Sequence, residues 1–281
     1  MTLGASGDLV LFVVSVAAGL LGALGGVGGG LVIVPVLTLG FGVDIHLAAV
    51  ASIVSVIATS SGAAVAFLRD GWANIRIAMF LQIATVIGAI VGALVAPDVP
   101  VQVLLLTLAI VLLISVAMQL ARLNDEPGTD VPLAAPDRFR LGGSYFSLRL
   151  KRELEYRPAR VSAGLAMMAV AGIISGLLGI GSGALKVLAM DGLMRLPMKI
   201  SSATSNFMIG VTAAASVGIY VARGYVDARL VAPVTLGILI GAVVGARMLP
   251  RLTNRHVRLV FVPVLLIIAL ETLLRGLGVN V

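Results

Sequence analysis

The sequence predicts an all-α protein that crosses a membrane many times. Of its 281 residues, 59% are hydrophobic and only 12% are charged, which is about half the charged share of a soluble domain. Apolar runs such as residues 77–97 and 101–121 reach the ~20 residues that a helix needs to cross a bilayer. A third observation is an internal repeat, in which two apolar stretches are broken by glycines at matching positions.

The composition argues against several classes of function. The chain has no cysteine and only two histidines, His46 and His256, so we expect no disulfide, no metal site and no cofactor. The formal net charge of +7 fits Lys and Arg held in cytoplasmic loops, and we expect no nucleic-acid partner. No basic region precedes the first apolar run, so we expect no cleaved signal peptide.

The internal repeat has an offset of 153 residues and needs no gap. Seven glycines of residues 19–96 fall on glycines of residues 172–249, where chance would give about two. Ser52 falls on Ser205, and Arg76 falls on Arg229. Chance likeness between glycine-rich membrane helices is the alternative. Internal repeats in membrane proteins indicate a transporter scaffold with its site at the repeat interface.

Each half of the chain shows five apolar segments. They lie at 8–25, 31–40, 45–68, 75–97 and 100–121, then at 160–179, 184–194, 199–222, 229–249 and 257–275. We therefore divide the chain into a first transmembrane repeat (1–121), a basic cytoplasmic linker (122–159) and a second transmembrane repeat (160–281). Alternation of apolar and polar residues at 146–151 predicts a short β-hairpin in the linker, with a basic segment lying on anionic lipid as the alternative.

The distribution of basic residues favours inverted repeats. If each half makes three crossings plus a glycine-broken hairpin, 16 Lys and Arg lie inside and 3 outside. If each half makes four crossings, the halves are parallel and the count is 13 against 6. The positive-inside rule favours the first arrangement, with both termini outside and the 122–160 loop cytoplasmic.

Two glycine-rich breaks, "LGGVGGGL" (24–31) and "LGIGSGAL" (178–185), precede short apolar segments. Ten residues of helix cover about 15 Å, half of the hydrocarbon core, so we expect each break near mid-membrane. A helix that starts there points unpaired N–H groups and its positive dipole end into the protein, which favours an anion. Close helix packing is the alternative role for these glycines.

Lys186 lies three residues after Gly183, inside an apolar segment, and its repeat mate is the uncharged Ile33. A cation at that depth is a functional-site hypothesis by default, although pairing with Asp191 or snorkelling would be structural alternatives. The helix start at 199–216 adds hydroxyl and amide donors, which could instead be packing residues. The predicted substrate-binding residues are Lys186, Asn206, Ser205, Thr204, Ser52, Gly28, Gly29, Gly181, Ser182 and Gly183.

Several stretches resemble one family of transporters. "GALGGVGGGLVIVPVL", "GLLGIGSGALKVLAM" and "LPMKISSATSNFMIGVTAAASV" are similar to segments of the sulfite exporter TauE/SafE family, and the similarity covers nearly the whole chain. The resemblance implies membrane transport of a small anion such as sulfite or an organosulfonate, frequently export.

We interpret the sequence as a secondary transporter in the plasma (inner) membrane that moves a small oxyanion by alternating access. Two alternatives stay open, an anion channel and an intramembrane enzyme that acts on a lipid-linked anionic headgroup. The enzyme would need an Asp, Glu or His at the cavity, and the apolar segments offer only Lys186 and hydroxyls. We therefore expect no enzyme. The partners are the anionic substrate and membrane lipid, and a homodimer is compatible with the sequence.

Overall fold

The computed structural model describes residues 5–25, 29–69, 72–121, 139–147, 152–248 and 254–279. The first half contains α1 (Ala5–Gly25), α2 (Gly30–Pro35), the π-helix η1 (Val36–Gly40), α3 (Ile45–Arg69), α4 (Ile75–Val95), the 3₁₀-helix η2 (Ala96–Asp98) and α5 (Val101–Ala121). A hairpin of β1 (Gly143–Ser147) and β2 (Arg152–Tyr156) follows. The second half contains α6 (Val161–Leu178), α7 (Gly183–Val187), the π-helix η4 (Leu188–Leu193), α8 (Met198–Ala222), α9 (Ala228–Met248) and α10 (Asn254–Gly276).

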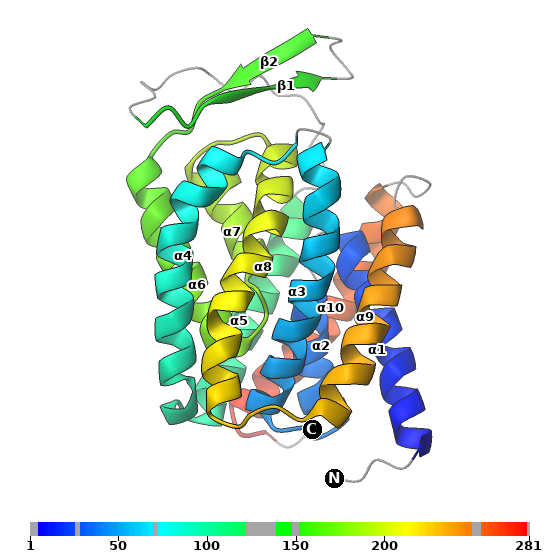
Figure 1. Cartoon of the computed structure of the whole chain (residues 1–281). Coiled ribbons are helices and arrows are strands. Elements are labelled where there is room, and N and C mark those ends of the chain that lie inside the picture. The colour runs from blue at the N-terminus through cyan, green and yellow to red at the C-terminus, as the bar shows by residue number, and fades with distance from the viewer. Residues whose placement is uncertain are drawn as a thin grey trace.

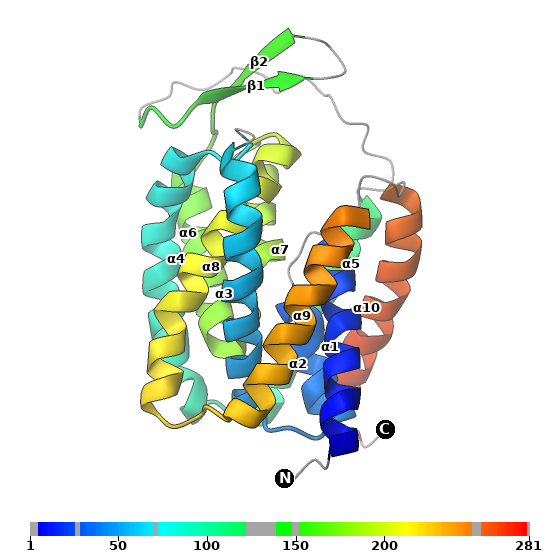
Figure 2. The same cartoon turned by 45° about the vertical axis from the view of Figure 1, so that its right-hand side comes forward.

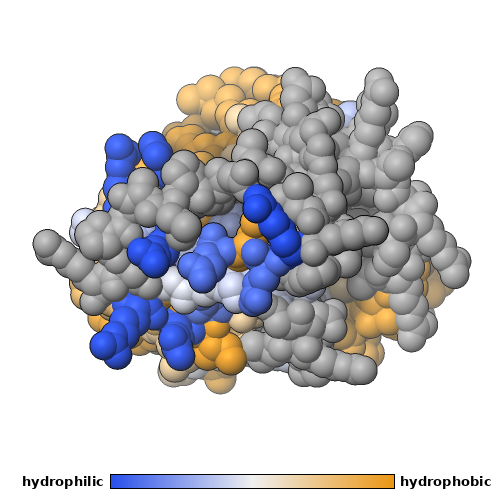
Figure 3. Space-filling model, turned by 90° about the horizontal axis from the view of Figure 1, so that it is seen from above, coloured by the Kyte–Doolittle hydropathy of each residue, from blue (hydrophilic) through white to orange (hydrophobic). Residues whose placement is uncertain are grey.

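The structure confirms an all-α polytopic membrane protein. Five segments of the described chain, at α4 with η2, α5, α6, α8 and α9, are long and apolar enough to cross a membrane. Large apolar side chains such as Met79, Ile83 and Ile267 lie exposed on the flanks of the bundle. Seen from the hairpin end, the molecule shows hydrophilic residues gathered on its upper face and hydrophobic ones around its rim (Figure 3). Such a surface suits a lipid environment on the flanks and water at the end.

The helices repeat with the same offset of 153 residues that the sequence shows. Ile45–Arg69 and Met198–Ala222 correspond residue for residue, as do Ile75–Val95 and Ala228–Met248. The short α2–η1 segment matches α7–η4, and a π-helical turn ends both. In Figure 1, α3 rises toward the hairpin while α8 descends from it. The ring of His46 at the start of α3 accordingly contacts Tyr225, just after the end of α8.

The two halves interlock. α1 packs against α9 and α4 packs against α6, while α3 pairs with α8 and α5 with α10. Figure 2 shows α4, α6 and α8 gathered on one side and α1, α9 and α10 on the other, with α3 between them. Because every major pair joins one half to the other, neither half has a separate core.

Glycines let these helices touch. A Cβ at Gly92 on α4 would lie 2.1 Å from the carbonyl oxygen of Ile173 on α6. At the repeat-related interface, a Cβ at Gly241 on α9 would lie 2.0 Å from the carbonyl oxygen of Val16 on α1. Small residues permit such close backbone approach between membrane helices. Gly88 on α4 and Gly237 on α9 also lie too close to a neighbouring backbone to carry a side chain, so the small-residue strips at 88–92 and 237–245 serve helix packing.

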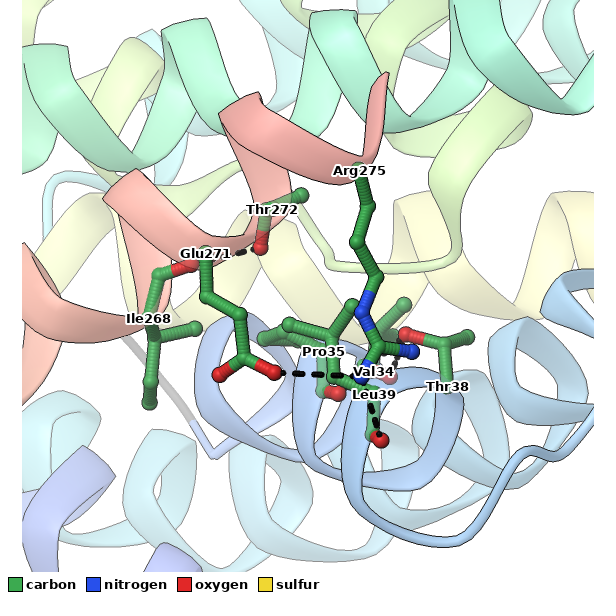
Figure 4. A network of polar contacts seen from close by, with 8 residues as sticks. All are labelled: Val34, Pro35, Thr38, Leu39, Ile268, Glu271, Thr272 and Arg275. Atoms are coloured by element: carbon green, nitrogen blue, oxygen red, sulfur yellow. Dashed lines mark hydrogen bonds and ion pairs between the residues drawn. The ribbon is translucent and has the colours of Figure 1, made fainter. Parts of the chain in front are cut away.

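A polar contact fixes α10 to the first half. The Arg275 guanidinium donates to the carbonyl oxygen of Leu39, at the end of η1, and to Glu271 Oε1, both at 3.3 Å (Figure 4). The pair of Glu271 and Arg275 is an i,i+4 ion pair about one-third exposed. The positive charge of Arg275 therefore compensates both the negative C-terminal end of the α2–η1 segment and the carboxylate of Glu271.

The β-hairpin lies over the end of the bundle opposite the start of α1 and the end of α10 (Figure 1). Asn74 attaches it, because its Nδ2 donates to the Leu141 carbonyl oxygen at 3.2 Å and to the Tyr156 hydroxyl at 2.8 Å. The Oδ1 of the same residue caps α4 by accepting from the Ile77 N–H. Burial raises the pKa of Tyr156 more than the hydrogen bond from Asn74 lowers it.

Candidate functional site

The two glycine breaks meet inside the bundle. A Cβ at Gly30, the first residue of α2, would lie 2.6 Å from Ser52 Oγ and 3.2 Å from the carbonyl oxygen of Ile180. Ser52 Oγ donates to the carbonyl oxygen of Gly179 at 2.7 Å. The start of the short helix α2 therefore lies against the glycine break that precedes the short helix α7. Of the first break, Gly29 is buried beside Gly30, and Gly28 lies outside the described residues.

The second break needs glycine because its backbone turns left-handed three times. Gly179 and Gly181 have φ of 68° and 71°, and Ser182 has φ of 44°. Glycine adopts this region without a steric cost, whereas a serine there is uncommon. The turn ends α6 and restarts the helix at Gly183, and Ser182 is the residue before that new helix.

Lys186 is completely buried one turn into α7. Its Nζ donates to the carbonyl oxygen of Gly181 at 3.1 Å and to Thr212 Oγ1 at 2.8 Å. Both acceptors are neutral, so these contacts solvate the ammonium group without cancelling its charge. A buried cation held this way is costly unless a negative group joins it.

Thr212 and Gln82 complete the polar surroundings of Lys186, and neither is among the residues predicted from the sequence. Thr212 Oγ1 donates to the Met208 carbonyl oxygen at 2.8 Å and accepts from Gln82 Nε2 at 2.9 Å. Gln82 is the one amide side chain in the apolar run 77–97, which was a usable signal. Thr212 gave no comparable signal, because threonine is common in membrane helices. We call Lys186, Thr212, Gln82 and the Gly181 carbonyl the lysine cluster.

The predicted residues of α8 divide between different environments. Ser205 lies at the break and donates to the carbonyl oxygen of Gly183 at 3.2 Å. Thr204 points toward α4 instead, where its Oγ1 accepts from the Asn74 N–H. Asn206 donates to the Ser202 carbonyl oxygen on its own helix and is half-buried. Adjacent helical positions point about 100° apart, so three consecutive side chains could not all face one ligand.

Two buried polar atoms of this region have no hydrogen-bond partner among the described residues: Gln82 Oε1 and Ser182 Oγ. Buried polar atoms are nearly always paired with protein, water or a ligand. Gln82 belongs to the lysine cluster, and Ser182 directly follows Gly181, whose carbonyl oxygen accepts from Lys186. The region therefore has hydrogen-bonding capacity that the protein itself does not use.

These features define a polytopic membrane protein with a broken-helix polar centre, the architecture of a membrane transporter. The chain belongs to the sulfite exporter TauE/SafE family, whose profile matches residues 11–272. The family resemblance seen in the sequence is thus confirmed.

Two curated relatives come from Bacillus subtilis (strain 168). "Probable membrane transporter protein YdhB" is 26% identical over 241 residues, covering 85% of this chain and 87% of the relative. "Probable membrane transporter protein YunE" is 28% identical over 118 residues, 42% of this chain and 43% of the relative. No solved structure matches the chain. This protein is a membrane transporter.

Proposed function

We propose that this transporter carries a small oxyanion, such as sulfite or an organosulfonate, and that Lys186 binds its negative charge. The observation that supports this most strongly is the fully buried ammonium group with two neutral acceptors. An ammonium group can donate three hydrogen bonds, so one N–H of Lys186 stays available for a ligand oxygen.

The glycine breaks favour the same ligand. Gly183 starts α7 beside the lysine cluster, and Gly30 starts α2 against the break at Ile180. The first N–H groups of a helix have no partner within that helix, and their partial positive charge favours an anion. Ser205 and Ser182 supply hydroxyls at the same break, whereas Thr204 and Asn206 now have partners elsewhere and are weaker candidates.

Alternating access between two inverted repeats is the proposed mechanism. Its support is the matching of helix boundaries at an offset of 153 residues, with α3 and α8 running in opposite directions. Ser52 and Ser205 are repeat mates, and each lies at the start of its own half-helix, Gly30 or Gly183. Rocking of one half against the other would open the shared centre to one face at a time.

The proposed orientation places the hairpin in the cytoplasm and both termini outside, and the proposed direction is export. On the hairpin side, Arg76, Arg140, Arg152, Arg157, Arg160 and Arg195 are exposed, whereas the opposite face of the described chain carries Arg223, Arg229 and Arg275. This bias agrees with the positive-inside rule.

The experiment is anion binding to purified Lys186→Met, measured by calorimetry with sulfite, methanesulfonate and acetate. A charge-assisted hydrogen bond contributes about 1.5–3 kcal/mol, so we expect affinity to fall tenfold or more. Ile33→Met, at the repeat-related position, is the matched control and should bind as the parent does. Parent-like binding by folded Lys186→Met would make the lysine structural and would remove the main support for an anionic substrate.

A further inference from the structure

We infer that the transported anion also carries a hydroxyl group, which donates to Gln82 Oε1 while Lys186 holds the negative charge. This inference rests on the proposed function and specifies its substrate. It follows from the direction of each hydrogen bond in the lysine cluster.

Thr212 determines how the Gln82 amide is oriented. The single hydroxyl proton of Thr212 goes to the Met208 carbonyl oxygen at 2.8 Å. Its oxygen can then only accept, and it does so from Lys186 Nζ at 2.8 Å. The Gln82 atom 2.9 Å from the same oxygen must therefore be a donor, which is Nε2 and not Oε1. The amide oxygen consequently points away from Thr212.

Gln82 Oε1 is left as an acceptor without a partner. It is buried, and no hydrogen-bond donor among the described residues reaches it. The Gln82 side chain is 5% exposed. A buried acceptor without a hydrogen bond is unfavourable. A donor group on the bound ligand would supply the missing hydrogen bond to Gln82 Oε1. The cluster thus offers a ligand two donors, the third N–H of Lys186 and the second N–H of Gln82 Nε2, and one acceptor, Gln82 Oε1.

A ligand with acceptor atoms alone fits this set poorly. The oxygens of a fully deprotonated oxyanion can meet Lys186, but any oxygen that faces Gln82 Oε1 brings two lone pairs together. An anion with an O–H group satisfies both positions. Sites that hydrogen-bond a substrate hydroxyl discriminate strongly against analogues that lack it, because the analogue leaves a buried polar group unpaired.

The repeat-related positions lack this chemistry. Lys186, Gln82 and Thr212 correspond to Ile33, Thr235 and Thr59. Thr235 Oγ1 is already paired with Ser55 Oγ at 3.2 Å, and Thr59 Oγ1 bonds carbonyl oxygens of its own helix. Among the described residues, the unpaired acceptor and the cation therefore occur together at only one of the two repeat-related positions, where Gln82 of the first half meets Lys186 and Thr212 of the second. Thr235 also provides a matched control position.

The first test uses the unmodified protein and two ligand pairs of equal charge and length. One pair is 2-hydroxyethanesulfonate and 1-propanesulfonate, and the other is glycolate and propionate. We expect the hydroxylated member of at least one pair to bind roughly three- to tenfold more tightly, the worth of one neutral hydrogen bond. Equal binding within both pairs, or preference for the methyl members, overturns the inference and leaves the proposed function standing. Absence of binding by all four anions overturns the inference, whereas the proposed function is overturned only if sulfite and methanesulfonate also fail to bind.

The second test removes the acceptor. Gln82→Met keeps the length of the side chain but removes the acceptor, so we expect the preference for the hydroxylated anion over its methyl partner to fall to about one. Thr235→Val should keep the full preference. Selectivity that survives in folded Gln82→Met would show that another group accepts the hydroxyl, and would overturn the assignment to Gln82. If this variant does not fold, the comparison of ligand pairs on the unmodified protein still decides.

Discussion

The hydroxyl of Ser52 on α3 donates to the carbonyl oxygen of Gly179 at the end of α6, across 2.7 Å and between the two halves of the chain. Ser52 is itself fully buried, and Gly30 leaves no room for a side chain beside it. The Ser52 hydroxyl thus lies where three elements meet: α3, the start of α2 and the glycine break between α6 and α7.

We expect Ser52→Ala to destabilise the protein by about 1–3 kcal/mol, because the buried Gly179 carbonyl loses its side-chain donor. The measurement is thermal unfolding in detergent. Ser61→Ala on the same helix is the control, since its exposed hydroxyl bonds only the Ile57 carbonyl oxygen. Equal melting of the two variants would show that the Ser52 bond adds no stability.

Gly92→Ala should disrupt the contact between α4 and α6. A Cβ there would lie 2.1 Å from the Ile173 carbonyl oxygen, and backbone cannot move aside as a flexible side chain can. We expect a loss of about 1–3 kcal/mol from overpacking, seen as lower yield and melting temperature. In contrast, Gly218→Ala on α8 meets no heavy atom within 4 Å and should be neutral or slightly stabilising. Stability unchanged in Gly92→Ala would contradict the close packing of these helices.

Asn74→Ala should release the hairpin from the bundle. The substitution removes both side-chain hydrogen bonds to the hairpin region as well as the cap of α4. We expect faster tryptic cleavage after the exposed Arg140 and Arg152, monitored by mass spectrometry. Asp227→Ala separates the two effects, because Asp227 caps α9 at the repeat-related position on the opposite face. If both variants are cleaved at the same rate, Asn74 does not hold the hairpin.

The orientation can be tested directly because the sequence contains no cysteine. Asp98 is exposed at the end of the bundle away from the hairpin, and Ser144 is exposed on β1. In whole cells, an impermeant thiol reagent should label Asp98→Cys and should label Ser144→Cys only after lysis. Labelling of Ser144→Cys alone in intact cells would reverse the proposed orientation.

The amino-acid sequence by itself determined the class of protein, the offset of the repeat and the positions of the helix breaks. Hydropathy, composition and glycine spacing are local properties of the sequence. Where water is excluded, the backbone must satisfy its hydrogen bonds internally, so a long apolar run forms a helix. Residues 45–69 and 198–222 are helical at the same offset that the glycines show. Lys186 also stood out locally, because a charge in an apolar segment needs no three-dimensional information to be noticed.

The tertiary structure alone decided which polar groups surround Lys186. Gln82 is 104 positions away in sequence and reaches the cluster because α4 packs beside α8. Thr204 carries the same kind of donor as Ser205, yet the helix turns its hydroxyl to Asn74, away from the break. Such contacts depend on how helices from the two halves rotate and pack against each other. That rotation is fixed by close approaches such as Gly92 with Ile173, which the periodicity of a single helix does not encode.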